Sequence, residues 1–116
     1  MRPPPPRITG EAGDPAAARD QFAALVPVTE RVMGAEHPDT LDVRFDLARF
    51  TGMAGDAAAA RDQHAALLAV TERVMGAEHP DTLAARAGLV RWTSRADDDA
   101  GNRRLARWPA TRRDGR

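Results

Sequence analysis

The sequence predicts an all-α fold, a right-handed stack of antiparallel helical hairpins, and three observations lead to that prediction. A 14-residue string, VTERVMGAEHPDTL, occurs twice without a change, at 28–41 and 70–83. Aligning residues 9–50 with 51–92 leaves only 11 mismatches in 42 positions. No segment alternates polar and apolar residues in the manner of a β-strand. A period of this length is typical of solenoids, whose units bury their apolar faces only against one another.

The first helix is predicted to begin after Asp14, which is a good N-cap residue, with Pro15 in the first helical position. Residues at spacings of three and four then define one face of this helix. They are Ala18, Phe22, Leu25, Thr29 and Val32. We expect Gly34 to end the helix, because glycine is favoured just past a helix C-terminus.

A second, shorter helix is predicted after the link at 34–38, with Asp39 or Thr40 as its cap. Its larger side chains are Leu41, Phe45, Leu47 and Phe50, and Gly52 and Gly55 are expected to end it.

The second copy repeats this plan. Asp56 is expected to cap a third helix that ends at Gly76, and a fourth helix is expected from about Asp81 through Trp92. Residues 93–109 resemble a worn third copy and predict a fifth helix. The chain thus divides into a proline-rich leader at 1–13, a repeat domain of about two and a half units at 14–108, and a basic tail at 109–116.

Composition narrows the functional class. The chain has no cysteine, no apolar run long enough for a secretory signal or a membrane span, and arginine as its only strongly basic residue. These features, with the high alanine content, suggest a soluble cytoplasmic protein from a GC-rich bacterial genome.

Charge is unevenly distributed along the chain. Residues 14–92 carry 8 Arg against 12 Asp plus Glu, a net charge of −4, whereas residues 93–116 carry 7 Arg against 4 Asp, a net charge of +3. The arginine-rich C-terminal tail therefore offers an alternative function, binding to nucleic acid or an acidic surface. The other interpretation is that the tail is a solvated chain end.

The combination of Leu47-Ala48, Gly55-Asp56 and the link G-x-x-H-P-D-T-L resembles the tetratricopeptide repeat, in particular its 42-residue kinesin-light-chain type, which is abundant in bacteria. The resemblance covers about 14–108. It implies a non-catalytic protein–protein interaction module that presents a concave groove to a peptide or protein, either alone or as a fragment of a larger regulatory protein. Two adjacent asparagines that contact a peptide in the light-chain type are replaced here by residues 45–46 and 87–88.

By helical phase, five residues are expected on the inner face of the shorter helices: Phe45, Arg49, Met53, Arg91 and Arg95. Arg49 and Arg91 are equivalent in the repeat, so adjacent units would set them side by side. Such arginines can hold an acidic peptide or a terminal carboxylate. The alternative is that they are exposed arginines paired with neighbouring acidic residues.

No motif for catalysis, a cofactor or a metal is found. His-Pro-Asp at 37–39 and 79–81 repeats with the unit and is interpreted as part of the link, not as the single tripeptide of a J-domain. There is no phosphate-binding loop and no nucleophile elbow. Because about three units are normally needed for a stable array, we expect either a homo-oligomer that covers the open ends of the stack or a longer array.

Overall fold

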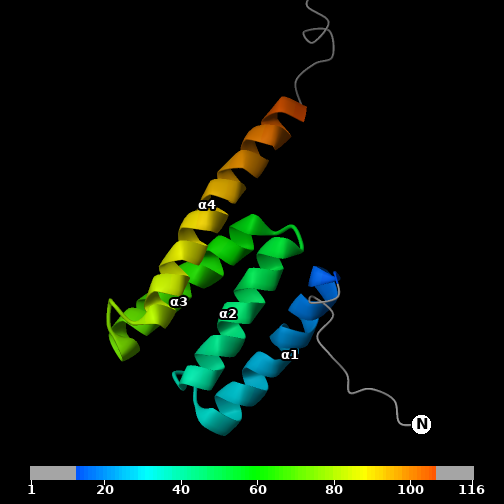
Figure 1. The fold of residues 1–116 in the computed structure, drawn as a ribbon. Helices are drawn as coiled ribbons and strands as arrows, with labels where there is room; N and C mark the ends of the chain where they lie inside the picture. Colours follow the sequence, from blue (N-terminus) through cyan, green and yellow to red (C-terminus); the bar gives the residue numbers. More distant parts are fainter. Residues whose placement is uncertain (1–12, 107–116) are drawn as a thin grey trace, which may run out of the picture.

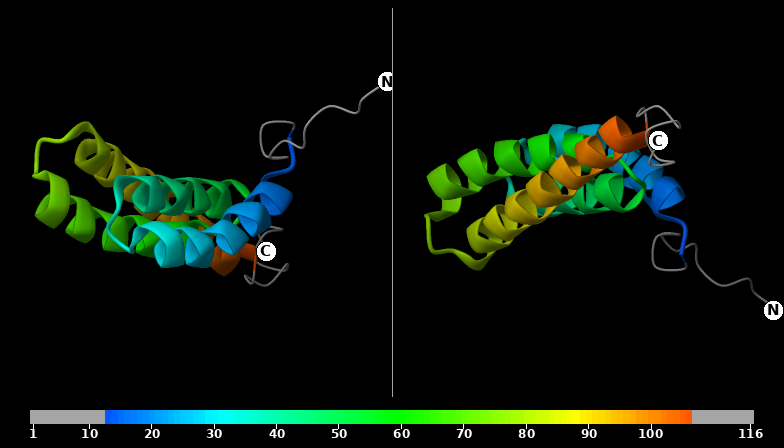
Figure 2. Two further views of the ribbon diagram at one scale, coloured as in Figure 1. Left: turned by 90° about the horizontal axis from the view of Figure 1, so that it is seen from below. Right: turned by 90° about the horizontal axis from the view of Figure 1, so that it is seen from above.

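A computed structural model describes residues 13–106, and within that range it contains four α-helices and no strand. They are α1 (Pro15–Met33), α2 (Pro38–Met53), α3 (Ala57–Met75) and α4 (Pro80–Ala106). Each helix packs against the next one in the chain, so the helices form a stack of hairpins (Figure 1). In the view from above, α4 crosses the helices behind it at an angle (Figure 2). The predicted all-α fold is confirmed.

The first helix of each copy, α1 and α3, begins and ends as the sequence predicts. The carboxylates of Asp14 and Asp56 accept hydrogen bonds from the backbone amides three residues ahead, at 3.1 Å and 3.0 Å. Gly34 and Gly76 follow the last helical residues with φ of +104° and +100°. This conformation is readily adopted only by glycine.

The starts of α2 and α4 correct our prediction, because neither Asp39 nor Thr40 caps α2. His37 is the N-cap, and its Nδ1 accepts a hydrogen bond from the Asp39 amide at 3.0 Å. The same contact joins His79 to the Asp81 amide at 3.0 Å. The proline between the two residues takes the first helical position, where its missing N–H costs nothing.

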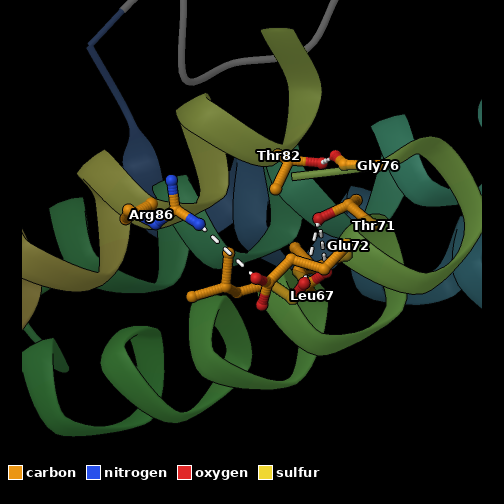
Figure 3. A network of polar contacts seen from close by, with 7 residues as sticks. Leu67, Thr71, Glu72, Gly76, Thr82 and Arg86 are labelled. Atoms are coloured by element: carbon orange, nitrogen blue, oxygen red, sulfur yellow. Dashed lines mark hydrogen bonds and ion pairs between the residues drawn. The ribbon is translucent and has the colours of Figure 1, made fainter. Parts of the chain in front are cut away.

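Threonine side chains close the links between helices. The Thr40 hydroxyl donates to the Gly34 carbonyl at 2.7 Å, and the Thr82 hydroxyl donates to the Gly76 carbonyl at the same distance. Figure 3 shows the second of these contacts beside Thr71, whose hydroxyl donates to the Leu67 carbonyl at 2.9 Å. Thr40 and Thr82 are fully buried, so the link geometry is fixed identically in the two copies.

The fifth helix that we predicted does not form, because α4 runs without a break to Ala106. After α2 the chain turns at Gly55, which has φ of +110°. The equivalent position in α4 is Asp97, and an aspartate favours such a backbone far less than glycine does. The C-terminal part of α4 therefore continues as a helix and projects beyond the other three (Figure 1).

The apolar face predicted for α1 is only partly buried. Ala18 and Phe22 pack against α2 in a cluster with Phe50, and the Phe22 and Phe50 rings stack at 5.6 Å between centroids. Leu25 and Val32 are exposed. For Leu25 the reason is that no described helix precedes α1, since its equivalent Leu67 is buried, whereas the equivalent of Val32, Val74, is exposed as well. The predicted proline-rich leader, apart from Gly13, and the tail at 109–116 lie outside the described residues.

Candidate binding groove

Between α2 and α4 the surface is hollowed, with α3 beneath it. A recess of about 280 Å³ contains two of the predicted arginines, and we call it the arginine recess. Its lining residues are Phe45 and Arg49 of α2, His64 of α3, and Ala84, Ala87, Gly88, Arg91 and Trp92 of α4. Three helices thus contribute to one surface depression.

The structure brings together three of the five predicted site residues. Phe45, Arg49 and Arg91 line the arginine recess, whereas Met53 and Arg95 do not. Arg95 lies further along α4, where its Nε contacts an Asp99 carboxylate oxygen at 3.2 Å. Helical phase thus grouped residues within about one turn of each other on α2, but it did not extend to Met53 or to Arg95.

Both arginines lie over aromatic rings. The guanidinium carbon of Arg49 is 5.0 Å from the centroid of the Phe50 ring, and that of Arg91 is 4.7 Å from the centroid of Trp92. Cation–π contacts of this kind restrain a long side chain while its N–H groups stay free to donate. No carboxylate of the described residues forms an ion pair with either guanidinium by direct contact.

His64 forms the floor of the recess, and the sequence reasoning missed it. The side chain is 1% exposed, and its ring meets Phe45 edge-on at 5.2 Å between centroids. Its Nδ1 has no hydrogen-bond partner among the described residues. Burial lowers the pKa of His64 from its ordinary value of 6.5, so the neutral ring is favoured.

Gly88 makes room for this histidine. A Cβ atom at Gly88 would lie 2.5 Å from Cε1 and 2.6 Å from Nδ1 of His64, far inside ordinary contact distance. The repeat alignment contains a signal for this pair, because His64 and Gly88 replace Phe22 and Asp46 of the first copy. Because these two substituted positions lie in contact, comparing the copies could have identified the floor of the recess.

A second, smaller recess of about 100 Å³ lies between the N-terminal halves of α2 and α4. It shares Phe45 and Ala84 with the arginine recess, and Asp42 and Asp81 line it. We call it the acidic recess. The pKa of Asp42 is raised, first by burial and then by the charges of Asp81 and Asp39. A cation placed there would relieve this cost.

No group of three or more His, Cys, Asp or Glu residues is arranged to hold a metal ion within residues 13–106. None of the helices in the described range is long and apolar enough to cross a membrane.

Comparison with known proteins gives one match. A profile of the tetratricopeptide repeat family matches residues 7–39 and 40–81, which is well over half of the chain. The second match begins two residues inside α2 and contains the rest of α2, the turn and all of α3, so it corresponds to one helix pair. Comparisons with curated proteins and with solved structures gave no match.

Proposed function

Because the chain belongs to the tetratricopeptide repeat family, we propose that it is a non-catalytic protein-interaction module that binds an extended peptide between α2 and α4. Repeats of this family generally mediate protein–protein interaction. The acidic and arginine recesses, which share Phe45 and Ala84, supply the groove. We place the module in the cytoplasm, in keeping with a chain that has no cysteine.

The observation that carries this proposal is the charge order along the groove. Carboxylates of Asp42 and Asp81 stand at one end, and guanidinium groups of Arg49 and Arg91 stand at the other. A ligand of the opposite order is favoured, because complementary charges fix orientation and register. The ligand should therefore carry an amine or a basic side chain at the acidic end and a carboxylate at the arginine end.

The helix geometry sets the length of the ligand. Asp42 and Arg49 are seven residues apart on α2, which corresponds to about 10 Å along the axis. An extended peptide covers that distance with about three residues. Between the two charged ends lies Phe45, whose ring is half-buried and accessible from both recesses. An apolar side chain of the peptide can pack there.

A C-terminal carboxylate is the anion that suits the arginine recess best. Two guanidinium groups can donate several charge-assisted hydrogen bonds to one carboxylate, which strengthens and orients the contact. An acidic side chain near the peptide terminus would serve in the same way. The partner is thus proposed to be a peptide with a short basic-apolar-acidic pattern that ends in a free carboxylate.

A binding experiment with a fluorescent peptide of this pattern tests the proposal. The double variant Arg49→Glu plus Arg91→Glu should abolish binding, because like charges replace complementary ones. The matched control is Arg19→Glu plus Arg61→Glu. These two arginines are also 42 residues apart, but they lie on α1 and α3 and contact their neighbours Asp20 and Asp62. Circular dichroism should show equal helix content in both double variants.

The peptide chemistry provides a second arm of the experiment. Replacing the terminal carboxylate with an amide should weaken binding if that group occupies the arginine recess. Equal affinity for the acid and the amide, or equal loss in the two double variants, would contradict the proposal. Binding of duplex DNA that weakens steeply as salt rises would instead favour the arginine-rich tail as the functional element.

A further inference from the structure

We propose that copies of this chain associate head to tail, with α4 of one copy packing against α1 of the next as α2 packs against α3 within a copy. The described helices alternate between two repeat types, since α1 and α3 are equivalent and α2 and α4 are equivalent. Only α2 and α3 form a complete pair of the kind that one family match covers. The helix at each end of the stack lacks the neighbour that its equivalent has.

The exposure of equivalent residues shows which neighbour is missing at the N-terminal end. Leu67 of α3 is 2% exposed, whereas its equivalent Leu25 in α1 is 41% exposed. Each leucine is followed by a helix of the α2 type, but within residues 13–106 only Leu67 is also preceded by one. The missing neighbour of α1 is therefore a helix like α2. Val28 and Val32 extend the same exposed face along α1.

The C-terminal end shows the reciprocal pattern. Leu41 of α2 is buried, whereas its equivalent Leu83 in α4 is 48% exposed. Likewise Ala48 is buried and its equivalent Val90 is exposed. Each of these helices is preceded by a helix of the α1 type, but within residues 13–106 only α2 is also followed by one. The missing neighbour of α4 is therefore a helix like α1 or α3.

The two exposed faces are thus the two halves of one interface that already exists in the chain. Leu41 and Ala48 of α2 share an apolar cluster with Leu67 of α3. A junction between copies would bring Leu83 and Val90 against Leu25 in the same arrangement. Two of the three equivalent pairs are identical, because leucine occupies both copies at 41 and 83 and at 25 and 67.

Charge complementarity supports the same junction. Within the chain, Arg73 of α3 contacts Glu36, which precedes α2, at 2.6 Å between Nη2 and Oε2. This contact lowers the pKa of Glu36, through the hydrogen bond first and the charge second. The equivalent residues are Arg31 on α1 and Glu78 before α4, and the structure shows no ion pair for either one within the described chain. The junction would place Arg31 of one copy beside Glu78 of the next.

Such a junction does not close on itself as a two-fold dimer does. Each copy uses its C-terminal face on one side and its N-terminal face on the other, so association continues as an open array. Every added copy would continue the alternation between helices of the α1 type and helices of the α2 type. The groove residues Arg49 and Arg91 take no part in the junction, so this inference and the peptide-binding proposal can fail separately.

Sedimentation velocity of the full chain over a wide range of protein concentration tests the inference, with two blocked variants. One carries Leu25→Glu and Val28→Glu in α1, and the other carries Leu83→Glu and Val90→Glu in α4. The unmodified chain should grow beyond a dimer as its concentration rises. Each blocked variant should stay monomeric alone, and an equal mixture of the two should give a dimer and nothing larger, because one intact face of each kind remains.

Other outcomes would overturn the inference. An unmodified chain that stays monomeric at every concentration would do so, and so would a mixture of blocked variants that does not associate. Dimers of the α4-blocked variant alone would show that α1 pairs with α1 instead. The substitutions replace exposed residues, and circular dichroism should confirm that the blocked variants remain helical.

Exchanging the charges of Arg31 and Glu78 tests the junction without changing its apolar faces. Arg31→Glu or Glu78→Arg alone should weaken association by about threefold to tenfold, since a surface ion pair is replaced by like charges. Both changes in one chain should restore it, because each junction then holds the exchanged pair. Arg61→Glu, on an exposed part of α3 outside the junction, is the control and should leave association unchanged. No rescue in the double variant would contradict the proposed register.

Discussion

The contact between Gly88 and His64 allows a sharp test of the groove floor by the substitution Gly88→Ala. The new Cβ would lie 2.5 Å to 2.8 Å from three atoms of the imidazole ring. The histidine cannot easily withdraw, because it is 1% exposed and lies edge-on against Phe45. Overpacking of this kind costs about 1–3 kcal/mol.

Helix propensity acts against this overpacking cost. Alanine is favoured over glycine in a helix interior by about 1 kcal/mol. The net change in the free energy of unfolding for Gly88→Ala should therefore be a loss of about 0–2 kcal/mol. Gly101→Ala is the matched control, since Gly101 lies in the same helix and a Cβ there meets nothing within 4 Å. That variant should gain up to about 1 kcal/mol.

The measured quantity is the difference between the two variants in urea denaturation followed by circular dichroism. Helix propensity cancels in that difference, which should be about 1–3 kcal/mol in favour of Gly101→Ala. Adding His64→Ala to Gly88→Ala should remove most of the difference, because the clashing ring is gone. Equal stabilisation by the two glycine replacements would refute the packing of His64 under the groove.

Two further predictions concern the same core. The pKa of buried His64 is lowered from the ordinary histidine value of 6.5, so as pH falls below 6.5 the unfolded chain takes up a proton before the folded chain does. The free energy of unfolding should therefore decrease between pH 6.5 and the lowered pKa, and this histidine should leave it constant above that interval. This part of the pH dependence should be missing from His64→Leu, as seen in urea titrations at several pH values. Leu67→Ala should lose about 2–5 kcal/mol, whereas Leu25→Ala at the equivalent but exposed position should lose less than about 1 kcal/mol. Similar losses at the two leucines would mean that the faces of α1 and α3 are wrongly assigned.

The repeat made most of the fold predictable, because each copy confirms the other. Asp14 and Asp56 marked two helix starts, and Gly34 and Gly76 marked two ends. The starts of α2 and α4 were misplaced, since histidine is a less usual cap and its role depends on the ring nitrogen reaching a nearby amide. The missing break in α4 accompanies the replacement of Gly52 and Gly55 by Ser94 and Asp97.

The groove was less predictable than the fold for a different reason. Helical phase assigned Phe45, Arg49 and Arg91 to one surface, and all three line the arginine recess. It could not identify His64, because periodicity assigns a side chain to a face but does not say which surface that face reaches. Nor could it identify Asp42 and Asp81 as a second charged site. Their proximity arises from packing between two helices that are distant in sequence.

The differences between the two copies suggest how affinity and selectivity are divided in the groove. Arg49 and Arg91 are identical in the repeat, whereas Phe45, His64 and Gly88 are all at positions where the copies differ. In the proposed function, the shared arginines would attract an anion, and any acidic peptide could use that attraction. The differing residues make the two walls unequal, with a phenyl ring on α2 opposite a bare backbone on α4. Under the proposed function, a peptide would therefore be distinguished by its apolar side chain, which has one wall on which to pack, and not by its charge alone.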